Sequence, residues 1–155
     1  MSEYWKLSRL YLLLLLIFAA GRWYLGNVRH VAYEKATDKL SIVVLTLFAS
    51  LFYAAFCRRW RGYGLPRALG LAAFIAVMGQ IVVLLSTVIS YAAGVESYFN
   101  HPLALRVGAD AVSAGPVSFA QALVIRAQGI FANAVLNVIA GTLGWVMGAL
   151  LPQPR

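Results

Sequence analysis

The chain has 155 residues, of which 62% are hydrophobic and 12% are charged. Soluble domains average about 45–50% apolar and about 25% charged residues, and a core of this size cannot hide so much apolar surface from water. The composition therefore excludes an ordinary soluble protein and predicts one integral membrane domain over residues 1–155. The net charge of +8 is expected to face anionic lipid headgroups, so no nucleic-acid partner is predicted.

Four apolar segments are predicted to cross the membrane as helices and to form an all-α bundle. They are residues 7–26, 40–57, 68–94 and 119–151. At the start of the fourth, Ser118 followed three residues later by Gln121 predicts a capping box. A helix over residues 119–151 is about 50 Å long, which exceeds the bilayer core of about 30 Å, so its first turns are expected to extend beyond the outer face.

The loop between the second and third segments, residues 58–67, is densely basic. Cytoplasmic loops are enriched in Lys and Arg, so this loop and both termini are predicted to be cytoplasmic, in a bacterial inner membrane. Residues 27–39 and 95–118 then form outer-face loops, and the second of these is interpreted as a lid, a docking element or a passive cap. Anionic headgroups are expected to bind the four arginines of the basic loop, which are Arg58, Arg59, Arg61 and Arg67.

Neutral polar and small residues form stripes at helical spacing on three of the four segments. These residues are Thr46 and Ser50 on the second, Gln80, Thr87 and Ser90 on the third, and Asn133, Asn137, Gly141, Gly144 and Gly148 on the fourth. In lipid, helices associate by close backbone approach at small residues and by hydrogen bonds worth about 0.6–2 kcal/mol each. Helix packing is the simpler interpretation of the stripes, and a polar groove is the alternative. The first segment has no such stripe and is expected to face mainly lipid.

The predicted orientation places both histidines and most acidic residues on the outer face. If the second helix continues backwards, His30, Glu34 and Asp38 lie at i, i+4 and i+8 on one helix face. With Glu96 and His101 they would offer a cation site or a general acid and base, whereas a solvated ramp into the bilayer is the simpler interpretation. Near the same face, Arg126 is expected to reach a lipid phosphate or to pair with Glu96 or Asp110.

The sequence favours a non-catalytic function, that of a small accessory subunit whose stripes pack against partner transmembrane helices or against copies of itself. Two alternatives stay open: a self-associating pore or carrier for a neutral or lipidic solute, and an enzyme or metal site at the outer membrane surface. The pore would be lined by Gln80, Thr87, Asn133 and Asn137. Because the chain has one cysteine and no HExxH motif, neither a metal nor a cofactor is expected.

Overall fold

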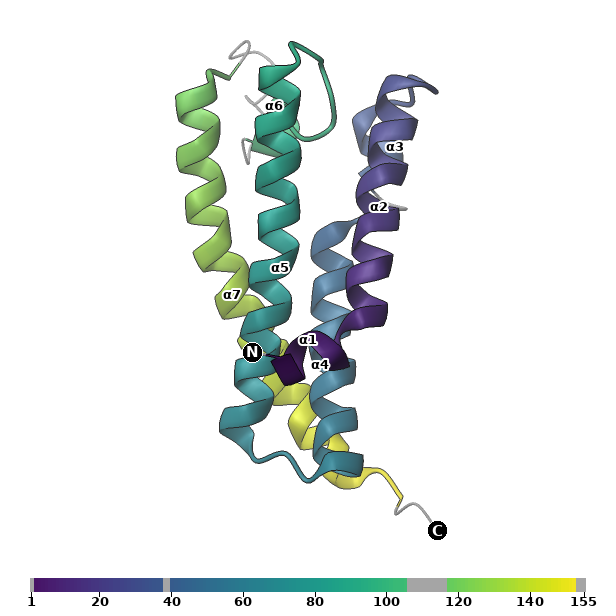
Figure 1. Ribbon diagram of the computed structural model, residues 1–155, viewed down its shortest axis with the longest axis vertical. Coiled ribbons are helices and arrows are strands. Elements are labelled where there is room, and N and C mark those ends of the chain that lie inside the picture. Colours follow the sequence, from purple (N-terminus) through teal and green to yellow (C-terminus); the bar gives the residue numbers. More distant parts are fainter. Residues whose placement is uncertain (1, 38–39, 106–116, 153–155) are drawn as a thin grey trace.

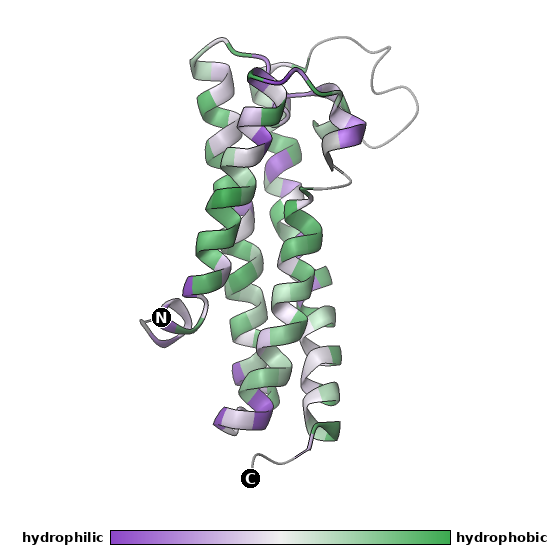
Figure 2. Cartoon of the chain, turned by 90° about the vertical axis from the view of Figure 1, so that its right-hand side faces the viewer, coloured by the Kyte–Doolittle hydropathy of each residue, from purple (hydrophilic) through white to green (hydrophobic). Residues whose placement is uncertain are grey.

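The computed structural model describes residues 2–37, 40–105 and 117–152. Of the described residues 82% are helical and none is in a strand, which confirms the all-α prediction. Four helices are long and apolar enough to cross a membrane: α2 (Arg9–Asn27), α4 (Ile42–Arg61), α5 (Leu65–Ala92) and α7 (Phe119–Leu150). They run along the long axis of the molecule (Figure 1), and hydrophobic residues fill most of their length while hydrophilic residues gather toward the two ends (Figure 2). The described ranges also contain three short helices, α1 (Ser2–Leu7), α3 (Tyr33–Thr37) and α6 (Pro102–Leu105).

Local capping signals set the ends of the long helices. Ser118 accepts the N–H of Gln121 and the Gln121 side chain returns to Ser118, so the predicted capping box of α7 is confirmed. Ser41 caps α4 by accepting the N–H of Val44 at 3.3 Å, and Gly62 ends that helix in the left-handed region at φ 65°. Because α4 continues to Arg61 and α5 begins at Leu65, the basic loop predicted over ten residues is mostly helical.

Helices α4, α5 and α7 form the tightly packed part of the bundle. A Cβ placed on Gly144 would lie 2.1 Å from the carbonyl oxygen of Leu51, and one on Gly148 would lie 2.6 Å from that of Ala55. Real Cβ atoms never approach this closely, so the backbones of α4 and α7 touch at these two positions. Gly141 meets α5 in the same way, because its Cβ would lie 2.6 Å from the Cβ of Ala72.

Helix α2 packs on this unit through one face. The buried residues Tyr11, Leu15, Ala19 and Arg22 recur every three or four positions, and the hydroxyl of Tyr11 donates to the carbonyl of Ile75 at 2.9 Å. Most of the other leucines of α2 are exposed. The first predicted segment is thus mostly uncovered by protein, as α7 is too, but it also carries a polar residue into the bundle.

The arginines at the α4–α5 turn contact protein groups. The guanidinium of Arg58 lies 3.5 Å from the ring centroid of Trp145 and donates to its carbonyl at 3.0 Å, while Arg59 donates to the carbonyl of Pro152 at 2.8 Å. Arg67 forms an exposed ion pair with Glu3 at 3.9 Å. Burial, together with a hydrogen bond to Glu3, raises the pKa of the nearby Tyr63 hydroxyl to about 12. These arginines therefore fasten α1 and the end of α7 to the turn, and headgroup binding by them stays a prediction.

Substitution of Gly144 by alanine is expected to destabilise the protein by about 1–3 kcal/mol, because the new methyl group forces the backbones of α4 and α7 apart. Reversible unfolding in detergent measures this change. Gly129→Ala is the matched control, since its Cβ would meet its nearest atom, Oε1 of Gln80, at an ordinary 3.8 Å. Equal stability of the two variants would contradict the close contact.

Candidate functional site

A cavity of about 460 Å³ lies between α2, α4, α5 and α7, in the half of the bundle away from the α4–α5 turn. Its walls include apolar side chains from α4, α5 and α7 and the rings of Tyr98 and Phe99, whereas α2 contributes Arg22. The polar groups that line it are strongly biased toward cations and amides: Arg22, Gln80, Arg126, Gln128 and Asn133. No Asp or Glu is found among its lining residues in the described part of the chain.

Arg22 is carried into this cavity by the inward face of α2 and is only 9% exposed. One of its terminal nitrogens donates to the carbonyl of Leu40 over a long 3.4 Å, and its Nε has no hydrogen-bond partner among the described residues. The guanidinium carbon lies 5.5 Å from the ring centroid of Phe99, 5.8 Å from that of Tyr33 and 6.0 Å from that of Tyr98. These rings stabilise the cation by about 0.5–2 kcal/mol, which is less than the cost of burying its charge.

Arg126 enters the same cavity from α7. It donates to the hydroxyl of Thr87 at 3.0 Å, to the carbonyl of Phe99 at 2.6 Å and to the carbonyl of Ala104 at 3.4 Å. These bonds use three of the five N–H groups of a guanidinium. Arg126 therefore points toward the segment that contains Phe99 and α6, because the carbonyls of that segment and the hydroxyl of Thr87 accept its hydrogen bonds. The expected contact with Glu96 is absent from the described residues, and Asp110 lies outside them.

Two amides of the cavity have polar atoms that find no hydrogen-bond partner among the described residues. Gln80 is only 5% exposed, and none of the hydrogen bonds between described residues includes it. Asn133 donates from Nδ2 to the carbonyl of Gly129 at 2.9 Å, which fixes the orientation of its amide, yet its buried Oδ1 accepts no hydrogen bond within the described chain. An unmet buried donor or acceptor costs about 1–3 kcal/mol. The cavity thus combines two cations with two amides whose hydrogen-bonding capacity is not filled by the described residues.

The other stripe residues pack helices together. Ser50 donates to Oδ1 of Asn137 at 2.7 Å, and Nδ2 of Asn137 donates to the carbonyl of Asn133 at 2.8 Å. Asn137 is fully buried, and each polar atom of its side chain therefore has a hydrogen-bond partner. The hydroxyls of Thr46, Thr87 and Ser90 donate to backbone carbonyls, and the Ser90 hydroxyl also pairs with that of Ser97. Of the four residues predicted to line a pore, only Gln80 and Asn133 line the cavity.

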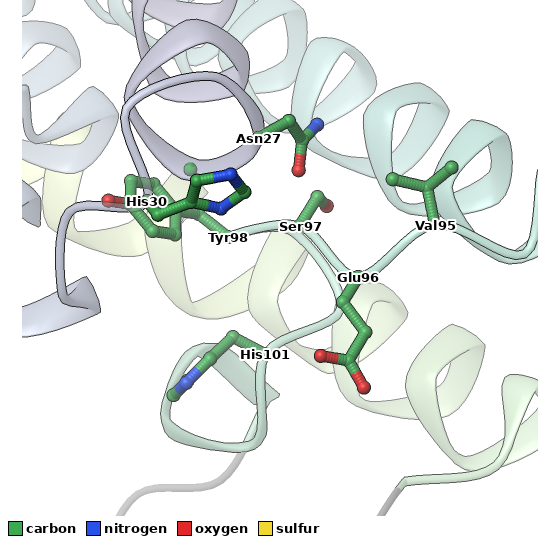
Figure 3. A pocket seen from close by; sticks show the side chains of 8 residues that line it. Asn27, His30, Val95, Glu96, Ser97, Tyr98 and His101 are labelled. Atoms are coloured by element: carbon green, nitrogen blue, oxygen red, sulfur yellow. The ribbon is translucent and has the colours of Figure 1, made fainter.

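The outer-face cluster does not form as predicted. His30 has a left-handed φ of 47° and precedes α3, and α4 begins at its own cap, so His30 and Glu34 do not share a continuous helix face. Asp38 lies outside the described residues. His30, Glu96 and His101 line a separate pocket of about 380 Å³, in which the imidazole of His101 turns away from the other two side chains (Figure 3). Within the described part of the chain, no three His, Cys, Asp or Glu side chains are placed to hold a metal ion.

Arg22 is the residue of this candidate site that the sequence analysis did not single out. The signal was present, because an arginine inside an otherwise uncharged apolar segment is expensive in lipid and usually faces a bundle interior or a cavity. The leucine-rich surroundings of Arg22 suggested a lipid-facing helix instead. Comparisons with family models, with curated proteins and with solved structures found no match to this chain.

A double-mutant cycle between Ser50→Ala and Asn137→Ala is expected to give a coupling energy of about 0.6–1.7 kcal/mol in detergent unfolding, because the two side chains share one buried hydrogen bond. Thr142 provides the control, since its hydroxyl bonds only within α7, to the carbonyl of Val138. The pair Ser50→Ala and Thr142→Ala should show no coupling. Coupling of the same size in both cycles would contradict the assignment.

Proposed function

We propose that this integral membrane protein binds a ligand through an oxyanion group, a phosphate or a carboxylate, which is seated between Arg22 and Arg126. The observation that carries the proposal is the presence of two guanidiniums, buried Arg22 and half-buried Arg126, on one cavity whose described lining includes no carboxylate. Both cations also approach the same residue, since Arg22 lies over the ring of Phe99 and Arg126 donates to its carbonyl. One oxyanion between them is therefore within reach of both.

Electrostatics favours an anion in this cavity over a neutral solute. Two like charges held in a low-dielectric interior repel each other, and each has lost its hydration. A guanidinium presents a planar fork of donors that matches carboxylate and phosphate oxygens, and such charge-assisted bonds are about twice as strong as neutral ones. Gln80 lines the same cavity, so its amide N–H would be a further donor to the oxyanion.

The expected accessory subunit stays a prediction, but the features that suggested it are used inside the chain. Gly144 and Gly148 contact α4 of the same molecule, and Asn137 bonds to Ser50. The carrier alternative fits the cavity better once its solute is changed from neutral to anionic. The enzyme alternative rested on the outer-face cluster, which the described residues do not assemble.

We further propose that both termini are cytoplasmic in a bacterial inner membrane, so that the cavity lies in the outer half of the bilayer. The support is the density of arginines at the α4–α5 turn, where three of them occupy the last turn of α4. The first turns of α7 would then extend beyond the outer face.

Cysteine labelling tests this orientation. Val28→Cys and Gly64→Cys place a thiol at exposed positions on opposite ends of the bundle without altering any charge, and the native Cys57 is fully buried. A membrane-impermeant maleimide is expected to label Val28→Cys in intact cells and Gly64→Cys only after the membrane is broken. The reverse pattern would overturn the orientation while leaving the cavity unaffected.

The Arg22→Gln variant tests anion binding, because its effect on stability is expected to change sign when phosphate is added. In delipidated protein without added anion, the substitution is expected to raise the melting temperature, because it removes a buried charge that has no carboxylate partner among the described residues. With saturating phosphate the wild type is expected to be the more stable protein, since only its cavity retains both cations. Tryptophan fluorescence during heating measures both conditions.

Arg29→Gln is the matched control, because Arg29 is an exposed arginine at the same end of the bundle and does not line the cavity. It should leave the phosphate effect unchanged. If Arg22→Gln lowers stability equally with and without phosphate, Arg22 has only a structural role and the proposal fails.

A further inference from the structure

We propose that the ligand is an amphiphile from the bilayer, with its oxyanion head on Arg22 and Arg126 and its apolar chain passing out between α4 and α7. This inference rests on the proposed function and adds the class of ligand and its route. It follows from where the cavity is open, where it is covered, and how deep the two cations lie.

The cavity reaches the protein surface between α4 and α7. The two helices touch at Gly144 and Gly148 and separate toward the other end of the bundle (Figure 1). In the widened part, the cavity lining includes Val43 of α4, which is 39% exposed, and the exposed residues Gln128 and Ala132 of α7. These positions lie within two apolar helices long enough to cross a membrane, so the opening faces the lipid.

The described loops cover the end of the cavity that faces away from the α4–α5 turn. Tyr98, Phe99 and Leu105 are each at most 5% exposed and line the cavity. Arg126 holds this cover through the carbonyls of Phe99 and Ala104, and the Tyr98 hydroxyl donates to the carbonyl of Val31, which joins the two loops. Burial raises the pKa of the Tyr98 hydroxyl, with Arg22 opposing the rise, so this donor stays protonated at neutral pH.

The depth of the cations suits the boundary between headgroups and chains. Arg22 is five residues before the end of α2 and Arg126 is seven residues after the start of α7, which corresponds to about 8 Å and about 11 Å along the helices. A lipid headgroup drawn to this level keeps its chain beside the apolar residues Ile42, Val43 and Ala132. The unused acceptor Oδ1 of Asn133 additionally suits a head that carries a hydroxyl group, such as a phosphate monoester.

Dodecyl phosphate and inorganic phosphate compare the same head with and without a chain. Each is added to delipidated wild-type protein in dodecyl maltoside, with dodecyl phosphate kept at a low mole fraction, and the melting temperature is followed by tryptophan fluorescence. Dodecyl phosphate is expected to reach half of its effect at a concentration at least about ten-fold lower, because its chain occupies the apolar opening. Arg22→Gln is expected to abolish the effects of both compounds.

Ala132→Trp tests the route by filling the opening while leaving both arginines in place. It is expected to remove the advantage of dodecyl phosphate and to retain the effect of inorganic phosphate, and Val43→Trp repeats the test from α4 if the first variant fails to fold. Leu143→Trp is the control, since Leu143 is exposed on α7 and does not line the cavity. Equal potency of the two phosphates, unchanged by Ala132→Trp, would overturn the amphiphile while preserving anion binding. Absence of any effect that depends on Arg22 would overturn both.

Discussion

The contact between the backbones of α4 and α7 is the constraint on which the rest of the structure depends. In lipid the hydrophobic effect does not drive helices together, so they associate where small residues allow their backbones to touch. Gly144 and Gly148 provide that contact at one end of the bundle, and the hydrogen bond from Ser50 to Asn137 extends it toward the middle. Because the two helices are fixed at one end and diverge at the other, the space between them becomes a cavity.

The polar side chains of the cavity are placed there by the faces that α2 and α7 turn toward it. Helix α2 turns Arg22 inward on the same face as its buried apolar residues, and α7 brings Arg126 and Asn133 in from the opposite side. A bundle selected only for stability would replace such groups by apolar residues, since buried charges and unpaired amides cost free energy. Their presence without described acidic partners is the reason to look for an anionic ligand.

Features encoded locally were predictable from the sequence. The capping box at Ser118 and the four long apolar helices depend on a few neighbouring residues and on composition, and both are found. Helix ends within the basic loop were less predictable, because arginines favour a helix C-terminus as much as a loop. The proposed continuation from His30 into α4 was wrong, since the Ser41 cap starts a new helix there.

The sequence by itself determined that this chain is an all-α protein with four helices able to cross a membrane. These properties depend on hydropathy and on spacing along single helices. Only the tertiary structure decided that Arg22, Gln80, Arg126 and Asn133 share one cavity. Their proximity depends on how α2, α5 and α7 are rotated and tilted against one another. Contacts between residues far apart in the sequence set these orientations, so the spacing of residues within a single helix does not predict them.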